Sequence, residues 1–135
     1  LMTASEAGKR GAEPIAVLVG HSSFAQEPAW FTTSPVSAIR ILHDKLGWSP
    51  DNVDLYEVNE AFAVVTMAAM RDLGIDHDKI NVNGGACALG HPIGASGARI
   101  TTTLLYALKA RGLKRGVASL CIGGGEAVAV GVELV

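Results

Sequence analysis

The hydrophobic pattern of the chain alternates between short β-rich runs and longer segments with helical periodicity. In the helical segments apolar side chains recur every three or four residues, and several of these segments end at a glycine. The β-rich runs are dominated by Val, Ile, Leu and Ala and are bounded by turn-forming residues. The predicted helices cover residues 5–11, 34–46, 61–73 and 96–111, and the predicted strands cover 14–24, 53–58, 80–82, 117–122 and 126–134.

Local signals define two of these helices well. Residues 34–46 begin with Ser34 as an expected N-cap and Pro35 at the first helical position, and Gly47 follows as the terminator. Residues 96–111 carry no charge between Arg99 and Lys109. This pattern predicts a helix that is buried on nearly every side.

The order β-α-β-α-β-α-β-β indicates a three-layer α/β/α domain. We expect a five-stranded mixed sheet with helices on both faces. The last two strands are separated only by glycines 123–125, so they should form an antiparallel pair and leave one strand antiparallel to the rest. In such sheets reactive groups collect where strands end and helices begin. Asn59, the turn before His91, and Cys121 all occupy such positions.

Composition favours a globular domain with extra apolar surface. The chain has 135 residues, of which 49% are hydrophobic and 18% charged, so a partner domain or subunit interface is expected. A net charge of −2 gives no basic patch and argues against nucleic-acid or anionic-membrane binding. No signal peptide is visible at the start, and two widely separated cysteines are typical of a cytoplasmic protein. Glycines and glutamates interrupt residues 117–135, which fits buried strands better than a membrane span.

Three residues are candidates for chemistry, and each has a structural alternative. Cys121 precedes three glycines whose N–H groups could converge on an oxyanion, but it could also be a buried strand cysteine beside a hairpin. His91 could polarise a carbonyl or take the proton of a thiol, or could serve a structural role. Asn59 could orient a water or a histidine, or could simply end a strand or cap a helix. Cys87 and His91 do not form a metal site, because no second ligand pair has suitable spacing.

Three motifs in sequence order resemble the C-terminal half of the thiolase family, and within it the bacterial acetyl-CoA C-acetyltransferases. They are NEAFA at 59–63, NVNGGACALGHPIGASGARI at 81–100 and CIGGGEAVA at 121–129. The resemblance implies that residues 14–135 are the C-terminal domain. Residues 1–13 would then be a linker and the tail of an N-terminal half that carries the nucleophilic cysteine. Because that half is not in this sequence, the chain alone is expected to be inactive.

The resemblance also implies an activity and a set of roles. The family joins two acyl-CoA molecules by Claisen condensation or cleaves a 3-ketoacyl-CoA by thiolysis, and acetoacetyl-CoA is the expected substrate. Coenzyme A thioesters are substrates, no metal or tight prosthetic group is implied, and a homodimer or homotetramer is expected. The implied roles are activation of the nucleophile by His91, α-proton transfer by Cys121, a water held by Asn59, an oxyanion-hole N–H from Gly123, pantetheine contacts from Ala61 and Phe62, and an acyl-pocket border at Phe31.

Two alternatives remain open. The chain could be a non-catalytic thiolase-like module that binds acyl or lipid ligands or mediates assembly, although Asn59, His91 and Cys121 are all intact. A decarboxylating ketoacyl synthase would have a related fold, but its partners are typically His/His or His/Asn. The cysteine in CIGGG at residues 121–125 therefore argues against that enzyme class.

Overall fold

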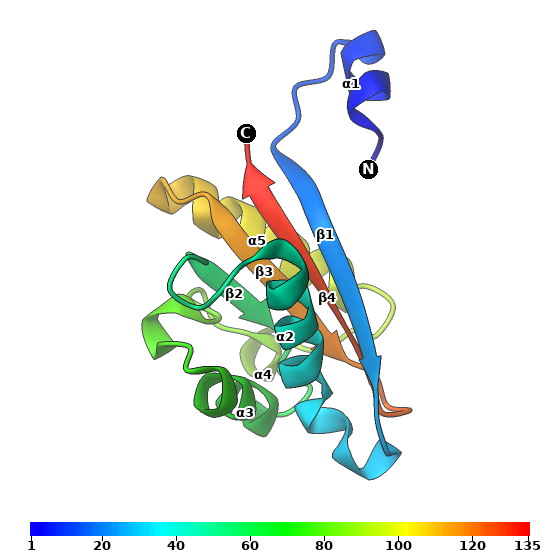
Figure 1. The fold of residues 1–135 in the computed structure, drawn as a ribbon, viewed down its shortest axis with the longest axis vertical. Coiled ribbons are helices and arrows are strands. Elements are labelled where there is room, and N and C mark those ends of the chain that lie inside the picture. Colours follow the sequence, from blue (N-terminus) through cyan, green and yellow to red (C-terminus); the bar gives the residue numbers. More distant parts are fainter.

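Four strands form one mixed sheet in the order β1-β4-β3-β2 in the computed structural model, which describes residues 1–135 (Figure 1). Strand β4 runs antiparallel to both β1 and β3, whereas β2 and β3 are parallel. One strand is therefore antiparallel to the other three, as predicted. The strands are β1 (Ala16–Ala25), β2 (Leu55–Val58), β3 (Arg115–Cys121) and β4 (Glu126–Leu134).

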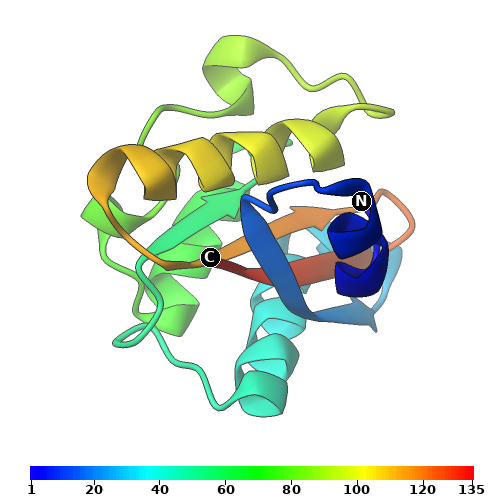
Figure 2. The same ribbon diagram turned by 90° about the horizontal axis from the view of Figure 1, so that it is seen from above.

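Helices cover both faces of the sheet and complete the three layers. Helix α5 lies on one face, and α2 and α3 lie on the other (Figure 2). The α-helices are α1 (Ala4–Arg10), α2 (Ser34–Leu46), α3 (Ala63–Leu73), α4 (Ala86–Leu89) and α5 (Ser96–Arg111), and the 3-10 helices are η1 (Pro28–Thr33) and η2 (His77–Lys79). None of these helices is both long and apolar enough to cross a lipid bilayer.

Two apolar clusters fill the spaces on either side of the sheet. Strand β2 contributes to both, because successive strand side chains point to opposite faces. Tyr56 and Val58 pack into the cluster on the α2 and α3 side, while Leu55 packs against α5. All four residues of β2 are buried, since both of its faces are covered. Glu57 therefore points into the α5 layer.

The predicted strand at residues 80–82 is wrong, and the sheet has four strands instead of five. Only single bridges form there, Tyr56 with Ile80 and Val82 with Gly84. Asn81 has a positive φ of 48°, which turns the backbone out of the extended conformation. A third strand cannot continue through a residue with this geometry.

Helix ends agree with the sequence signals more closely at the C-terminus than at the N-terminus. Gly47 and Gly74 end α2 and α3 in the left-handed conformation. Thr3 caps α1, which begins at Ala4, one residue before the predicted start, and α3 begins two residues later than predicted. Ser34 lies within α2 and does not cap it, because its hydroxyl donates instead to the Gly125 carbonyl at 2.7 Å.

Helix α5 has the predicted bounds but is amphipathic. The expectation that it is buried on nearly every side is wrong in this chain, because only one sheet lies against it. Its buried face is formed by Ser96, Ile100, Leu104, Ala107 and Leu108. Ala98, Thr102 and Tyr106 on the opposite face are exposed. Helix α1 lies apart from the sheet in Figure 1, and the proposed boundary between residues 13 and 14 stays a prediction.

Candidate active site

The candidate residues gather where β2 and β3 end. Asn59 follows the last residue of β2, and its backbone N–H donates to the Ser119 carbonyl of β3 at 2.9 Å. Cys121 is the last residue of β3. Because β2 and β3 are parallel neighbours, their carboxyl ends lie at the same edge of the sheet. The sheet register therefore places Asn59 and Cys121 at neighbouring strand ends.

Asn59 is fully buried, at 0% exposure, between a histidine and an arginine. Its Nδ2 lies 3.4 Å from both ring nitrogens of His91, a residue 32 positions away in the chain. Its Oδ1 lies 3.5 Å from Nη2 of Arg99. An amide nitrogen equidistant from both ring nitrogens cannot lie along the lone pair of either, so the contact with His91 is loose.

Ser96 holds the other side of the His91 ring. Its Oγ lies 2.6 Å from His91 Nδ1 and donates to the Pro92 carbonyl at 3.1 Å. A hydroxyl has only one hydrogen to donate, so both contacts are satisfied at once only when Nδ1–H of His91 donates to Ser96. In this arrangement Nε2 carries the free lone pair. His91 can then accept a proton at Nε2.

Cys121 is a buried thiol in this chain. It is 5% exposed and packs into the cluster on the α2 and α3 side of the sheet. Burial raises the pKa of the Cys121 thiol above its ordinary value, because the thiolate loses its hydration. No side-chain hydrogen bond joins Cys121 to Asn59 or His91. The sheet places Asn59 and Cys121 at neighbouring strand ends, but the thiol makes no hydrogen bond with Asn59 or His91.

The turn after Cys121 has two free N–H groups, those of Gly123 and Gly124, and one obligatory glycine. Gly123 is exposed and its N–H donates no hydrogen bond within the chain, so it is free to bind an oxyanion. Gly125 has a φ of +103°, and a Cβ there would overlap the carbonyl oxygen of Gln26. The shape of the turn therefore depends on Gly125.

The predicted substrate-contact residues form an apolar surface beside the site. The rings of Phe31 and Phe62 meet edge to face with centroids 6.4 Å apart. Phe62 is 59% exposed, whereas Ala61 and Phe31 are partly buried against the apolar cluster on the α2 and α3 side of the sheet. The structure thus brings together three residues that the sequence assigned to two separate segments.

Two charged residues of the site were missed by the sequence reasoning. Arg99 Nη1 lies 3.1 Å from Oε2 of Glu57, and both side chains are largely buried. Burial raises the pKa of Glu57 to about 7, while the Arg99 charge and hydrogen bond act in the opposite direction. A signal was present, because Glu57 interrupts a buried strand and Arg99 is the one Asp, Glu, Lys or Arg residue in the segment 80–108.

Glu60 fixes the glycine-rich segment that leads to His91. Its carboxylate accepts hydrogen bonds from Asn81 Nδ2 at 3.0 Å and from the Cys87 N–H at 3.1 Å. Burial alone would raise the pKa of Glu60, but these hydrogen bonds and the Arg99 charge lower it. Gly85 has no Cβ in the space that this carboxylate occupies. The absence of a side chain at Gly85 therefore leaves room for the Glu60 carboxylate.

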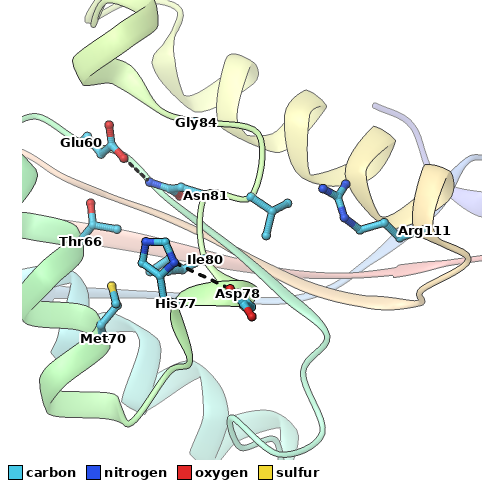
Figure 3. Close-up of a pocket in the computed structure, with 10 residues that line it drawn as sticks. Glu60, Thr66, Met70, His77, Asp78, Ile80, Asn81, Gly84 and Arg111 are labelled. Atoms are coloured by element: carbon cyan, nitrogen blue, oxygen red, sulfur yellow. Dashed lines mark hydrogen bonds and ion pairs between the residues drawn. The ribbon is translucent and has the colours of Figure 1, made fainter.

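A cavity of about 550 Å³ lies beside this clamp, between α3, η2 and the end of α5 (Figure 3). Thr66 and Met70 approach it from α3, and Arg111 approaches it from α5 on the opposite side. Asn59, His91 and Cys121 do not line it. This cavity is therefore separate from the candidate chemistry. No group of three or more His, Cys, Asp and Glu side chains is arranged to hold a metal ion.

Comparison with known proteins relates this geometry to a family. A family model described as "Thiolase, C-terminal domain" matches residues 12–134. The acetyl-CoA acetyltransferase of Allochromatium vinosum is 50% identical over 133 residues, covering 98% of this chain and 34% of that protein. The cytosolic acetyl-CoA acetyltransferase of Mus musculus is 49% identical with the same coverage. The chain thus spans about a third of the length of these relatives.

Solved structures give the same result. The Bacillus anthracis acetyl-CoA acetyltransferase superposes with a TM-score of 0.95 at 45% identity, over 99% of this chain and 34% of that chain. The Acat5 thiolase from Ascaris suum, solved in complex with coenzyme A, has a TM-score of 0.91 at 39% identity, over 98% and 34%. The chain therefore belongs to the thiolase family, and what it comprises is the C-terminal domain of that family.

Proposed function

We propose that this chain is the C-terminal catalytic domain of an acetyl-CoA C-acetyltransferase. The reaction is the Claisen condensation of two acyl-CoA molecules or, in reverse, thiolysis of a 3-ketoacyl-CoA such as acetoacetyl-CoA. The observation that carries this proposal is the placement of Asn59 against His91 at the sheet edge where Cys121 ends β3. The names of the relatives, which are acetyl-CoA acetyltransferases, support the same activity.

His91 is suited to activate a thiol. With Nδ1–H engaged by Ser96, the Nε2 lone pair can take the proton of a nucleophilic cysteine supplied by the N-terminal half. The resulting imidazolium can then donate from Nε2 to the oxygen of a thioester. One ring nitrogen thus serves as base in the first step and as donor in the second.

Cys121 is suited to move the α-proton. Condensation requires removal of a proton from the α-carbon of the second acyl-CoA, formation of the new C–C bond, and expulsion of the enzyme thiolate from the first acyl group. Burial raises the pKa of this thiol, so it is protonated at neutral pH and has a proton to give to carbon during thiolysis. It must lose its proton before it can act as the base for condensation.

Two groups near the ends of β2 and β3 can donate hydrogen bonds to the developing oxyanions. The Nδ2 hydrogens of Asn59 can hold a water that donates to an enolate oxygen. The free N–H of Gly123 can donate to the oxygen of a tetrahedral intermediate. Ala61, Phe62 and Phe31 offer an apolar surface for the pantetheine arm and the acyl group, and the coenzyme A thioesters are the substrates.

The chain needs a second half to act. We assign residues 1–13 to a linker and residues 14–135 to the domain, with the nucleophilic cysteine in an N-terminal half. The relatives are about three times as long as this chain, which supports that division. A cytoplasmic homodimer or homotetramer is the proposed form of the whole enzyme, and one relative is named a cytosolic enzyme. The chain alone should have no acetyltransferase activity.

A chimera tests the proposal. The matching C-terminal third of the Bacillus anthracis acetyl-CoA acetyltransferase is replaced by this chain, and both acetoacetyl-CoA thiolysis and acetyl-CoA condensation are measured. We expect an active chimera in which Cys121→Ser slows condensation at least about a hundredfold, while acylation of the nucleophilic cysteine by acetyl-CoA, followed by intact mass, persists. Loss of both steps together would contradict the base assignment for Cys121. A folded chimera with no turnover would favour the non-catalytic binding module.

A further inference from the structure

Arg99 and Glu57 form a buried ion pair next to the Asn59 side chain. Arg99 projects from the first turns of α5, and Glu57 projects from β2 into the same layer. The side chains of Arg99 and Glu57 are 21% and 2% exposed, and Nη1 lies 3.1 Å from Oε2. The second guanidinium nitrogen, Nη2, lies 3.5 Å from Asn59 Oδ1. One cation therefore contacts a carboxylate through one nitrogen and the Asn59 amide through the other.

A guanidinium group can donate hydrogen bonds but cannot accept them. An asparagine amide has an oxygen that accepts at one end and an NH₂ group that donates at the other. With Arg99 fixed by Glu57, only the oxygen end of Asn59 can face it without two sets of donors colliding. The NH₂ end must then face His91, where Nδ2 is found at 3.4 Å from each ring nitrogen.

We propose that Arg99, held in place by Glu57, is a positioning residue that fixes which end of the Asn59 amide faces His91. The catalytic meaning of this inference rests on the function proposed above. A reversed amide would set its oxygen against the Nε2 lone pair of His91 and would remove the donor that holds a water for the enolate oxygen. Arg99 acts through Asn59 and does not itself touch the reacting atoms.

The ion pair is poorly built as a stabilising element. Glu57 Oε1 and Arg99 Nε are buried without a hydrogen-bond partner, so the two groups share one good contact instead of a bidentate pair. Removing two charges from water carries a desolvation penalty that a single contact offsets only partly. A role in orienting a neighbour accounts for the pair better than stability does.

The orientation of Asn59 can be measured by NMR in the 135-residue chain. The observable is the nuclear Overhauser contact between the Asn59 side-chain NH₂ hydrogens and the ring hydrogens of His91. We expect this contact in the wild type and in Arg99→Lys, which keeps a cation near Oδ1. It should weaken in Arg99→Met, because no guanidinium then excludes the reversed amide and both orientations are populated. Arg111→Met is the matched control, since Arg111 lies on the same helix but contacts Asn83 and the Ala107 carbonyl instead.

Arg99→Met alone leaves Glu57 unpaired and can unfold the chain, so a second variant is needed. Glu57→Leu combined with Arg99→Met removes both charges and adds apolar contacts beside Leu55 and Ile100. In a folded double variant the same Overhauser contact should be clearly weaker than in the wild type. A folded double variant that keeps the contact at wild-type intensity overturns the proposal.

Kinetics in the chimera separate this inference from the proposed function. If the chimera is active, the double variant should lower kcat about tenfold and leave KM within about twofold, since Asn59 acts on the transition state. Arg99→Lys should restore most of kcat. An active chimera whose kcat is unchanged in the double variant overturns the positioning role. If the wild-type chimera is inactive, the proposed function fails, and the Overhauser contact alone decides whether Arg99 orients Asn59.

Discussion

The side chain of Asn81 forms two hydrogen bonds with the backbone of Val58, as a neighbouring strand would. Its Oδ1 accepts from the Val58 N–H at 2.8 Å, and its Nδ2 donates to the Val58 carbonyl at 2.8 Å. Nδ2 also donates to Glu60 Oε1 at 3.0 Å. The Asn81 side chain thus pairs with the outer edge of β2, where no further strand lies. It also links β2 to the Glu60 carboxylate, which holds the segment before His91.

Asn81→Asp should therefore destabilise the domain. At neutral pH the substitution replaces the Nδ2 donor with a carboxylate oxygen, which would face the Val58 carbonyl and the Glu60 carboxylate. The expected loss in unfolding free energy is about 2–3 kcal/mol, measured by urea unfolding at pH 7. Asn83→Asp is the control, because Asn83 is exposed and its side chain accepts a hydrogen bond from Arg111, and its effect should stay within about 0.5 kcal/mol. Equal effects for the two variants would contradict the proposed strand mimicry.

Glu57 should make the domain less stable as pH rises toward neutrality. Burial raises its pKa from 4.5 to about 7, so between these values the folded chain binds more protons than the unfolded chain. The contribution of Glu57 is fully present below pH 4.5 and is lost as pH rises through 7. The loss is about 3 kcal/mol over that interval.

The measurement for Glu57 is a difference between variants. Urea unfolding of wild type and Glu57→Gln is compared at pH 5 and pH 8. The comparison is needed because burial lowers the pKa of His43, whose contribution is lost as pH falls and so changes in the opposite direction. Glu126→Gln, at an exposed position, should show the wild-type pH dependence. A Glu57→Gln curve parallel to wild type would mean that Glu57 does not titrate in this range.

Two glycines of the same turn should respond differently to alanine. Gly125→Ala introduces a Cβ against the Gln26 carbonyl at a φ of +103°, and should cost about 2–4 kcal/mol of unfolding free energy. Gly123→Ala places its Cβ in open space and should cost less than about 1 kcal/mol. Thermal unfolding of both variants under one buffer condition is the measurement. A turn that tolerates Gly125→Ala would show that Gln26 can move away.

The two cysteines should differ in reactivity. Desolvation raises the pKa of both thiols, but Cys87 is exposed whereas Cys121 is buried, so the two differ in access. In the folded chain at pH 8, iodoacetamide should modify Cys87 first and leave Cys121 protected. In urea the two cysteines should be modified at similar rates. Peptide mass spectrometry measures the extent of modification at each cysteine. Modification of Cys121 at the rate of Cys87 under native conditions would mean that the end of β3 opens readily.

The local elements could be predicted because their signals are local. Gly47, Gly74 and Gly112 end three helices in the left-handed conformation. Alternating apolar runs located β1, β3 and β4 to within a few residues. A strand was wrongly predicted at residues 80–82, because Ile80 and Val82 are typical strand residues. The backbone at Asn81 between them is left-handed and ends the extended conformation. Nothing in composition distinguishes an asparagine that adopts this conformation from one that does not.

The candidate site was likewise predicted only in part from the sequence. The sequence by itself determined the family, the three motifs and the position of each motif at the end of a strand or the start of a helix, since these depend on residue type and spacing. Only the tertiary structure decided that Arg99 and Glu57 lie behind Asn59, that Ser96 engages Nδ1 of His91, and that Asn81 replaces a fifth strand. The contacts of Arg99 and Asn81 join residues far apart in the chain, whereas Ser96 and His91 are only five residues apart and meet across the turn that leads into α5. The contacts of Arg99 depend on which face of β2 packs against α5, and that is set by the packing of the whole domain.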